Sequence, residues 1–192
     1  MTVLALGAAL NLKDHETADH CTRVSENSVL LGALLNLSAF ELNNLKWSAY
    51  LHDVGKIGIP EQILLKPGAL TPDERRVMEK HPLMGYMMIQ NIEFLRYAGD
   101  VVLAHHENFG GTGYPYSLRG THIPLNARIF AIIDTLDAMT SDRPYRAALP
   151  FSAVAPELER QAGSQFDPEI VEMFLGASET TWLVQGRVAV KN

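Results

Sequence analysis

Most histidines in this sequence stand where metal ligands are commonly found. Five of the seven lie next to a carboxylate, next to another histidine or at the expected end of a helix: His20, His52, His81, His105 and His106. Imidazole and carboxylate ligands together suit iron, manganese or zinc, and the lack of cysteine ligands argues against a closed structural zinc site. The pattern therefore predicts a metal centre.

Two local pairs have the spacing that metal ligands need. Glu16 and His20 are four positions apart, so on a helix both side chains project from one face and can reach one ion. Such pairs also occur on solvated helices, and this one alone leaves both interpretations open. His52 and Asp53 end an apolar helix, where a carboxylate can bridge two ions. Paired ions about 3.5–4 Å apart are used for phosphoester cleavage.

A further acidic residue, Asp134, lies in the middle of the apolar stretch Ile129 to Met139. A buried carboxylate without a partner costs several kcal/mol, so Asp134 is expected to bind a metal or a cation. A salt bridge with Arg128 is the structural alternative. The doublet His105-His106 with Glu107 again falls at a helix end.

The elements that position these residues are expected to be helices throughout. Apolar residues recur at helical spacing and no series of alternating strands is found, which predicts an all-α fold. Ser38 with Glu41 and Thr71 with Glu74 are capping boxes that start helices. Helices are expected over 14–37, 38–52, 71–81, 83–91, 98–106, 125–141, 153–161 and after Asp167-Pro168, with a long glycine-rich loop over 107–121. In the first of these helices, the expected buried residues are Val24, Leu30, Leu31, Leu34 and Leu35.

Composition limits the function classes. The chain has 192 residues, 47% of them hydrophobic, which suits one compact domain. No apolar run approaches the roughly 18 residues of a membrane span, and the single cysteine, Cys21, cannot form an internal disulfide and is expected to pack. A cytoplasmic protein is expected. A net charge of -6 argues against binding a nucleic-acid polymer but leaves a small anionic ligand open, because metal ions would reverse the local field.

Beyond these single features, an ordered series of motifs resembles the HD-GYP domain family over about 14–175. The series is His52-Asp53-Val54-Gly55-Lys56-Ile57-Gly58-Ile59-Pro60, Lys66-Pro67-Gly68, His81-Pro82, His105-His106-Glu107, Gly111-Thr112-Gly113-Tyr114-Pro115, Ile123-Pro124, Ala127-Arg128-Ile129 and Asp134 to Arg146. The resemblance implies an HD-domain helical bundle with a long glycine-rich GYP loop. It places the catalytic domain at 14–176 and a C-terminal tail at 177–192. The apolar stretch Val3 to Leu10 separately suggests that 1–13 is the end of an upstream connecting helix.

The resemblance also assigns roles to individual residues. The implied metal ligands are His20, His52, Asp53, His81, His105, His106 and Asp134, with Glu16 matching the extra carboxylate of members that hold a third metal. The implied substrate contacts are Lys56, Gly113, Tyr114, Arg143 and Arg146, and the implied catalytic residues are Asp53, His52 and Lys56. Tyr114 either positions a guanine or ribose or anchors the loop. One departure is Gly110, which stands where the family usually has aspartate and puts the loop's conformation and protein contacts in doubt.

The function implied by the resemblance is a bacterial second-messenger phosphodiesterase. It would hydrolyse cyclic di-GMP to linear pGpG, to GMP, or to both, with two or three divalent ions, iron or manganese first and zinc as a further candidate. Cyclase (GGDEF) domains that contact the GYP loop and a second copy in a homodimer are the implied partners. Two alternatives stay open: an inactive module that binds a cyclic dinucleotide, and an HD phosphohydrolase acting on another nucleotide.

Overall fold

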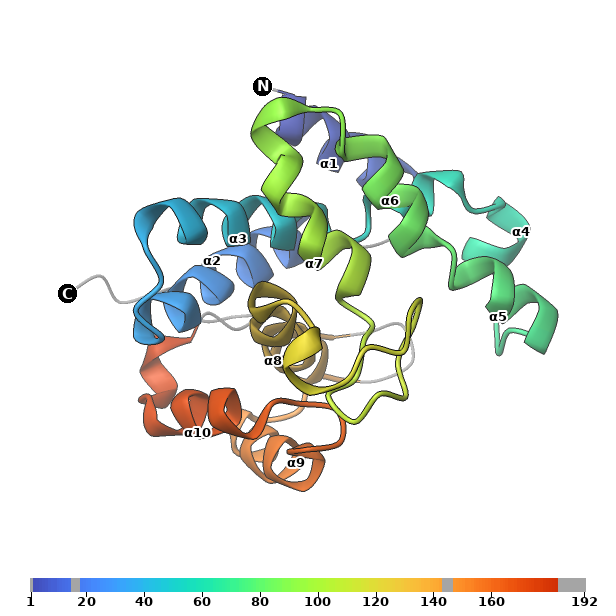
Figure 1. Cartoon of the computed structure of the whole chain (residues 1–192). Coiled ribbons are helices and arrows are strands. Elements are labelled where there is room, and N and C mark those ends of the chain that lie inside the picture. Colours follow the sequence, from blue (N-terminus) through green and yellow to red (C-terminus); the bar gives the residue numbers. More distant parts are fainter. Residues whose placement is uncertain (1, 15–17, 143–146, 183–192) are drawn as a thin grey trace.

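The structure is a computed structural model that describes residues 2–14, 18–142 and 147–182. Within these residues it contains helices and no named strand, which confirms the all-α prediction (Figure 1). No helix in the described ranges is long and apolar enough to cross a membrane. The α-helices are α1 (Thr2–Lys13), α2 (Ala18–Leu34), α3 (Ala39–Leu51), α4 (Glu61–Leu64), α5 (Pro72–Met78), α6 (His81–Ile89), α7 (Gly99–Ala104), α8 (Leu125–Thr140), α9 (Val154–Gln161) and α10 (Pro168–Gly176).

Helix starts follow the local signals in the sequence. The Ser38 hydroxyl accepts from Glu41 N at the start of α3, and the Glu41 carboxylate accepts from Ser38 N at 2.8 Å. Thr71 and Glu74 form the same reciprocal pair at the start of α5. At α10, Asp167 Oδ1 caps Glu169 N while Oδ2 pairs with Arg128 of α8. These caps confirm the predicted starts and fix the directions in which the helices leave their loops.

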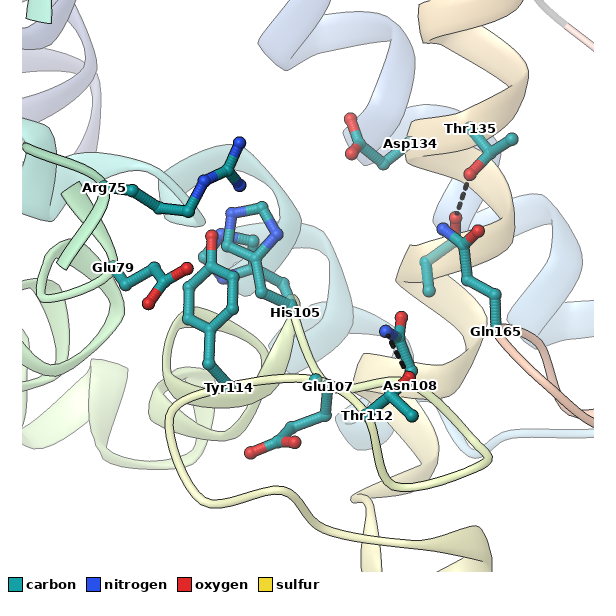
Figure 2. A pocket seen from close by; sticks show the side chains of 13 residues that line it. Arg75, Glu79, His105, Glu107, Asn108, Thr112, Tyr114, Asp134, Thr135 and Gln165 are labelled. Atoms are coloured by element: carbon teal, nitrogen blue, oxygen red, sulfur yellow. Dashed lines mark hydrogen bonds between the residues drawn. The ribbon is translucent and has the colours of Figure 1, made fainter. Parts of the chain in front are cut away.

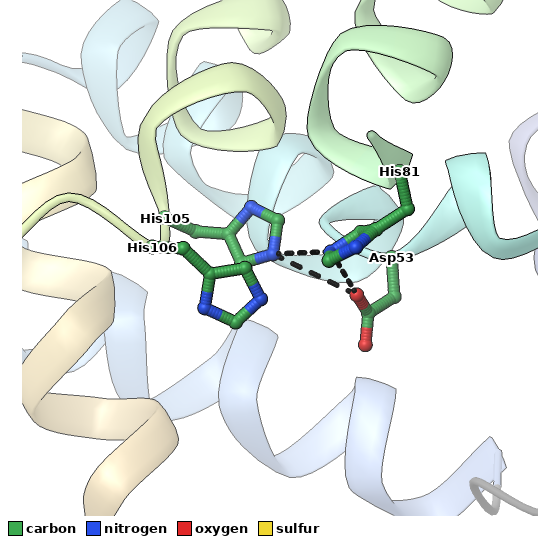
Figure 3. A group of neighbouring side chains, drawn as sticks. All are labelled: Asp53, His81, His105 and His106. Carbon is green, nitrogen blue, oxygen red and sulfur yellow. Dashed lines mark hydrogen bonds and ion pairs between the residues drawn. The ribbon is translucent and has the colours of Figure 1, made fainter. Parts of the chain in front are cut away.

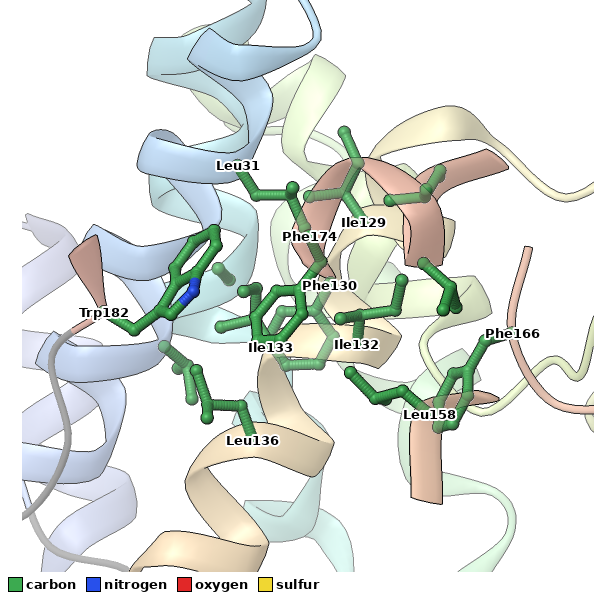
Figure 4. Packing of buried hydrophobic residues seen from close by; sticks show 14 of the residues in the cluster. Leu31, Ile129, Phe130, Ile132, Ile133, Leu136, Leu158, Phe166, Phe174 and Trp182 are labelled. Atoms are coloured by element: carbon green, nitrogen blue, oxygen red, sulfur yellow. The ribbon is translucent and has the colours of Figure 1, made fainter. Parts of the chain in front are cut away.

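Helix α8 lies at the centre of the larger core, with α2, α9 and α10 packed around it (Figures 1 and 4). Phe130, Ile133 and Leu136 of α8 are completely buried. Phe174 of α10 stacks on Trp182, with ring centroids 4.4 Å apart. A smaller core joins α1, α3, α6 and α7 through Val3, Leu51, Val54, Ile89, Leu95, Ala98 and Val102. The two cores hold between them the helix ends that carry the histidines.

The predicted first helix differs from the structure at its end and on one face. Helix α2 stops at Leu34 because Asn36 adopts a left-handed conformation with φ 60°. Val24 and Leu31 are buried as predicted, whereas Leu30 and Leu34 are 36% and 40% exposed. Predicting both as buried was wrong, because α3 and α8 pack against one side of α2 and leave these two leucines on another.

A close backbone contact joins the segment after α3 to α6. The short 3-10 helix η1 (Val54–Gly58) follows the His52-Asp53 pair, and Gly55 lies against the first turn of α6. A methyl group on Gly55 would collide with the carbonyl group of His81 and would lie 2.5 Å from Gly85 N. The absence of a side chain at Gly55 therefore lets the Asp53 segment approach the helix that carries His81.

Substituting Gly55 by alanine is expected to destabilise the fold by about 3 kcal/mol, the upper end of the usual cost of overpacking. The added methyl group meets backbone atoms of α6, which cannot rotate away as a side chain can. Chemical denaturation of the variant measures the loss. Gly176→Ala is the matched control, because a methyl group there would meet nothing within 4 Å. Equal stability of the two variants would contradict the close approach.

Helix α1 contacts η1 through a hydrogen-bonded lysine and an ion pair. Its last residue, Lys13, donates from Nζ to the carbonyl oxygens of Ile57 and Ile59, the latter at 2.8 Å. Asp14, which follows α1, forms an ion pair with Lys56 at 3.0 Å. These contacts connect α1 directly to η1.

Candidate metal centre

Four of the predicted ligands converge from three places in the fold. Asp53, His81, His105 and His106 each present a ligand atom, and these atoms all lie within 4.8 Å of one another. Asp53 Oδ1 is 3.0 Å from His81 Nε2 and 3.6 Å from His105 Nε2 (Figure 3). We call this group the Asp53 cluster.

A second group lies next to the first. His20 of α2, His52 at the end of α3 and Asp134 of α8 also bring ligand atoms within 4.8 Å of one another, and we call them the His20 cluster. The other oxygen of Asp53, Oδ2, is 3.1 Å from His52 Nε2. The two oxygens of Asp53 therefore point to different clusters, as the oxygens of a bridging carboxylate do.

Backbone carbonyl groups set the orientation of three of the imidazoles. His52 Nδ1 is 2.8 Å from Ala49 O, His81 Nδ1 is 2.8 Å from Met78 O, and His105 Nδ1 is 3.0 Å from Val102 O. A carbonyl oxygen can only accept, so Nδ1 carries the proton in each ring. Each histidine sits at a helix end and bonds to the preceding turn, which turns Nε2 towards its cluster. This is the arrangement by which proteins orient metal-binding histidines.

The donor set fits a divalent cation. With Nδ1 protonated, the Nε2 atoms of His81 and His105 face each other 3.1 Å apart. Two neutral imidazoles of this tautomer present lone pairs to each other, which is unfavourable unless a cation lies between or beside them. Asp53 Oδ1 is buried and accepts no hydrogen bond of good geometry from the described residues. Nitrogen and oxygen ligands in this number suit iron, manganese or zinc.

The protonation states also favour metal binding. Burial lowers the pKa of His105, and this effect is larger than the opposite effect of the nearby Asp53 carboxylate. Burial, together with the neighbouring His105 and His81, also lowers the pKa of His106. Burial alone would raise the pKa of Asp53, but Lys56 and His52 outweigh it and hold that pKa well below its usual range. These groups are therefore already in the forms that bind a cation at neutral pH.

Asp134 joins the cluster, but not for the reason predicted from its apolar surroundings. Its side chain is 37% exposed and lies 4.0 Å from His20 Nε2, so the cost of burying an unpaired carboxylate does not apply to it. The alternative salt bridge with Arg128 was also wrong, since Arg128 pairs with Asp167. Asp134 lies on the part of α8 that faces the pocket rather than the core.

A buried carboxylate on the same helix, Asp137, was missed by the sequence analysis. Its Oδ2 is 2.7 Å from His20 Nδ1, and Arg23 Nε is 2.5 Å from its Oδ1. Burial would raise the pKa of Asp137, but the hydrogen bonds from His20 and Arg23 outweigh it and lower this pKa to about 2. Asp137 therefore holds the ring of His20 as the backbone carbonyls hold the other rings. Its position three residues after Asp134 was the available signal.

We expect Asp137→Asn to weaken ion binding at the His20 cluster by about 10–100-fold, the usual cost of removing a carboxylate that orients a ligand histidine. The amide has no negative charge and keeps only one acceptor oxygen for the donors of His20 and Arg23, so the tautomer and the orientation of the His20 ring are held less firmly. Titration with Mn(II) followed by calorimetry measures the change. Asp142→Asn, an exposed substitution at the end of α8, serves as control; equal affinities in the two variants would contradict the role of Asp137.

The GYP loop covers the Asp53 cluster and is itself held by Glu107. The Glu107 carboxylate is buried and accepts from Tyr116 N at 2.8 Å and from Leu118 N at 2.9 Å. Tyr114 stacks on His106 with centroids 4.6 Å apart, so it anchors the loop to the cluster. A methyl group on Gly113 would collide with the backbone of His106, Glu107 and Asn108, which explains glycine there by packing alone.

The position where the family usually has aspartate, Gly110, lies at the other edge of the loop. Gly110 N donates to Ser164 O at 2.7 Å, in the turn between α9 and α10. Phe109 N donates to Gln165 O at 3.1 Å in the same turn. The backbone of the loop is thus connected to the turn between α9 and α10 by two backbone hydrogen bonds.

A cavity of about 320 Å³ opens beside the clusters. His105, His106, Asp134 and Tyr114 line it, and the other lining residues include Arg75, Glu79, Thr135 and Gln165 (Figure 2). Glu16, Arg143 and Arg146, which the sequence analysis assigned to a third ion and to the substrate, lie outside the described residues. Lys56 forms ion pairs with Asp53 at 2.7 Å and with Asp14 at 3.0 Å.

The sequence is similar to those of known proteins. The chain is 40% identical over 176 residues to a cyclic di-GMP phosphodiesterase response regulator of Xanthomonas campestris, with 91% of this chain and 47% of the relative covered. It is 39% identical over 165 residues to a cyclic di-GMP phosphodiesterase of Thermotoga maritima, with 85% of this chain and 45% of the relative covered. The chain thus spans about half the length of these relatives.

Among solved structures, a cyclic GMP-AMP specific phosphodiesterase of Vibrio cholerae superposes with a TM-score of 0.70 at 19% identity. The match covers 91% of this chain and 47% of that one, and it supports the fold. The family model of the HD domain matches residues 6–170. From this match over most of its length, the chain belongs to the HD domain family, in the HD-GYP group that its motifs indicate.

Proposed function

We propose that this chain is a metal-dependent phosphodiesterase that hydrolyses cyclic di-GMP. The observation that carries the proposal is the placement of Asp53, whose two oxygens point to two adjacent clusters of ligands at the edge of a cavity. Adjacent ions of this kind serve in-line displacement at phosphorus. The names of the relatives from Xanthomonas and Thermotoga support the same substrate.

The residues of the chain have distinct parts in the proposed reaction. Two divalent ions would supply Lewis acidity to the phosphodiester and to the attacking water. Asp53 would hold the two ion positions at a fixed separation, and His52 would bind at the His20 cluster through Nε2. Lys56, whose ammonium group is 2.7 Å from Asp53 Oδ2, would add positive charge where the negative charge of the phosphate increases.

We infer that the ions are iron or manganese, with zinc as a further candidate, because all three accept imidazole and carboxylate ligands. Two ions correspond to the two clusters, and Glu16 would contribute to a third. Gly113 and Tyr114 of the GYP loop, with Lys56, Arg143 and Arg146, are the proposed substrate contacts. The products would be linear pGpG, GMP or both, and the protein would act in the cytoplasm. A cyclase domain would bind the exposed face of the GYP loop around Tyr116.

A mixed cyclic dinucleotide is the second candidate substrate. The similar Vibrio cholerae structure is that of a cyclic GMP-AMP specific phosphodiesterase, which keeps this substrate open for the present chain. The two substrates differ in one base, so the choice between them depends on groups that contact the bases rather than on the metal clusters.

The decisive experiment is an assay of protein purified without oxygen. Its metals are counted, Fe(II) or Mn(II) is supplied, and cyclic di-GMP is followed by chromatography beside protein that has been treated with a chelator. Conversion to pGpG or GMP only in the metal-loaded sample supports the proposal. Bound metal and retained cyclic di-GMP without conversion would instead indicate a binding module.

A further inference from the structure

Two charged side chains that have no part in the site described so far line the same cavity. Arg75 lies on α5 and Glu79 directly follows this helix, and both belong to the cavity lining with His105, His106 and Tyr114. Figure 2 shows Arg75 and Glu79 on the side of the cavity that also holds Tyr114, with Asp134 on the opposite side. Helix α5 thus supplies one wall of the cavity.

These two side chains differ from their charged neighbours on the helix. Glu74 pairs with Lys66 at 2.5 Å, and Asp73 pairs with Arg76. Arg75 and Glu79 are one turn apart, a spacing at which opposite charges attract, yet within the described residues neither side chain forms an ion pair or a hydrogen bond. Glu79 stands between the carboxyl end of α5, where a negative charge is unfavourable, and the start of α6, where it is favourable, so the two helix dipoles oppose each other at this residue. Helix stability therefore does not account for the pair.

The nature of the cavity restricts what Glu79 can bind. A carboxylate would repel the phosphates of a cyclic dinucleotide, so it requires a hydrogen-bond donor. The bases supply such donors. Guanine presents acceptors, N7 and O6, at one end of its edge and donors, N1–H and the 2-amino group, at the other. The fork of an arginine fits the acceptor end, and a carboxylate fits the donor end.

The spacing of the two side chains suits this edge. Their Cβ atoms, one helical turn apart, are separated by about 5–6 Å, which is comparable to the distance between the acceptor and donor ends of guanine. Adenine carries an amino group where guanine has O6 and a lone pair at N1. Adenine would therefore keep only N7 as an acceptor for Arg75, place its amino donor where the arginine fork expects O6, and present a lone pair to Glu79.

We propose that Arg75 and Glu79 form a subsite that binds one guanine base of the substrate and rejects adenine at that position. This inference rests on the proposed function for the identity of the substrate. It does not require that both bases be guanine, so a mixed dinucleotide can enter with its guanine in the subsite, whereas cyclic di-AMP cannot.

Hydrolysis of three substrates tests the subsite. The unmodified protein should prefer cyclic di-GMP to cyclic di-AMP by about 10–100-fold in kcat/KM, the usual discrimination from a bidentate base contact, with cyclic GMP-AMP close to cyclic di-GMP. Glu79→Gln and Arg75→Ala should each reduce this ratio about 10-fold or more. The neighbouring exposed substitutions Asp73→Asn and Arg76→Ala are matched controls and should leave the ratio unchanged. Unchanged ratios in Glu79→Gln and Arg75→Ala would overturn the inference.

Binding of mononucleotides separates this inference from the proposed function. Equilibrium dialysis of the Mn(II)-loaded protein should give tighter binding of GMP than of AMP, and Glu79→Gln should remove the difference. A preference for GMP that depends on Glu79 in a protein without hydrolytic activity would retain the subsite and refute the phosphodiesterase. Hydrolysis with equal binding of GMP and AMP, or no binding of either, would refute the subsite.

Discussion

Asp53→Asn is expected to lower kcat for cyclic di-GMP by about 10³-fold or more, because losing the Lewis acidity of the ions forfeits several kcal/mol of charge stabilisation. The amide keeps one oxygen and replaces the other by a donor, so the side chain can no longer bind one ion with each oxygen. The metal count should fall in parallel. Single-turnover kinetics and elemental analysis of the same preparation measure the two effects.

The variant should still fold, which makes the result interpretable. The new amide nitrogen can donate to His81 Nε2, the atom that lies 3.0 Å from Asp53 Oδ1 in the unmodified protein. Asp100→Asn, an exposed substitution on the helix that leads to His105, is the matched control and should retain both rate and metal content. Full metal occupancy and an unchanged rate in Asp53→Asn would contradict the bridging role of this residue.

Metal binding is expected to raise the stability of the fold by about 2.7 kcal/mol at a free ion concentration 100 times the dissociation constant. For a chain of this size, such a gain corresponds to a rise in Tm of about 5–10 °C. The ligands come from α2, from the ends of α3 and α7, from α6 and from α8, so the clusters exist only in the folded chain. Thermal denaturation with Mn(II) and with a chelator measures the shift.

Two controls make this shift specific. His81→Gln removes one ligand of the Asp53 cluster and should reduce the rise in Tm, while leaving the hydrophobic cores intact. Calcium prefers oxygen ligands in larger number, so it should stabilise the protein far less than manganese. An equal rise with calcium, or an undiminished rise in His81→Gln, would show that the ions act elsewhere.

The local elements were predictable because their signals are local. Ser38 with Glu41, Thr71 with Glu74 and the Asp167-Pro168 start each combine a side chain with a backbone group at most three residues away. The exposure of Leu30 and Leu34 was not predictable in this way. The spacing of apolar residues identifies an apolar stripe on α2, but this stripe is wider than the part of α2 that α3 and α8 cover.

The candidate ligands were predictable from residue type, and their partition into two clusters was not. His52 and Asp53 are neighbours in sequence, yet their side chains belong to different groups. Arg75 and Glu79 carried no sequence signal that singled them out, and Asp137 carried only its spacing of three residues from Asp134. Their places follow from how α5 and α8 pack in three dimensions, which brings α5 to the cavity and turns Asp137 towards α2.

The attachment of α1 extends the influence of the metal centre beyond the cavity. Asp14 and Asp53 share the ammonium group of Lys56, and Lys13 holds the carbonyl groups at the end of the same turn. Moving α1 away would leave the charge of Lys56 to Asp53 and would release the turn that carries it. We therefore expect a change in the docking of α1 to alter the affinity for the ions, and by thermodynamic linkage ion binding would alter the docking by an equal free energy. The docking of the first helix and the binding of ions at the metal centre are therefore expected to be coupled equilibria.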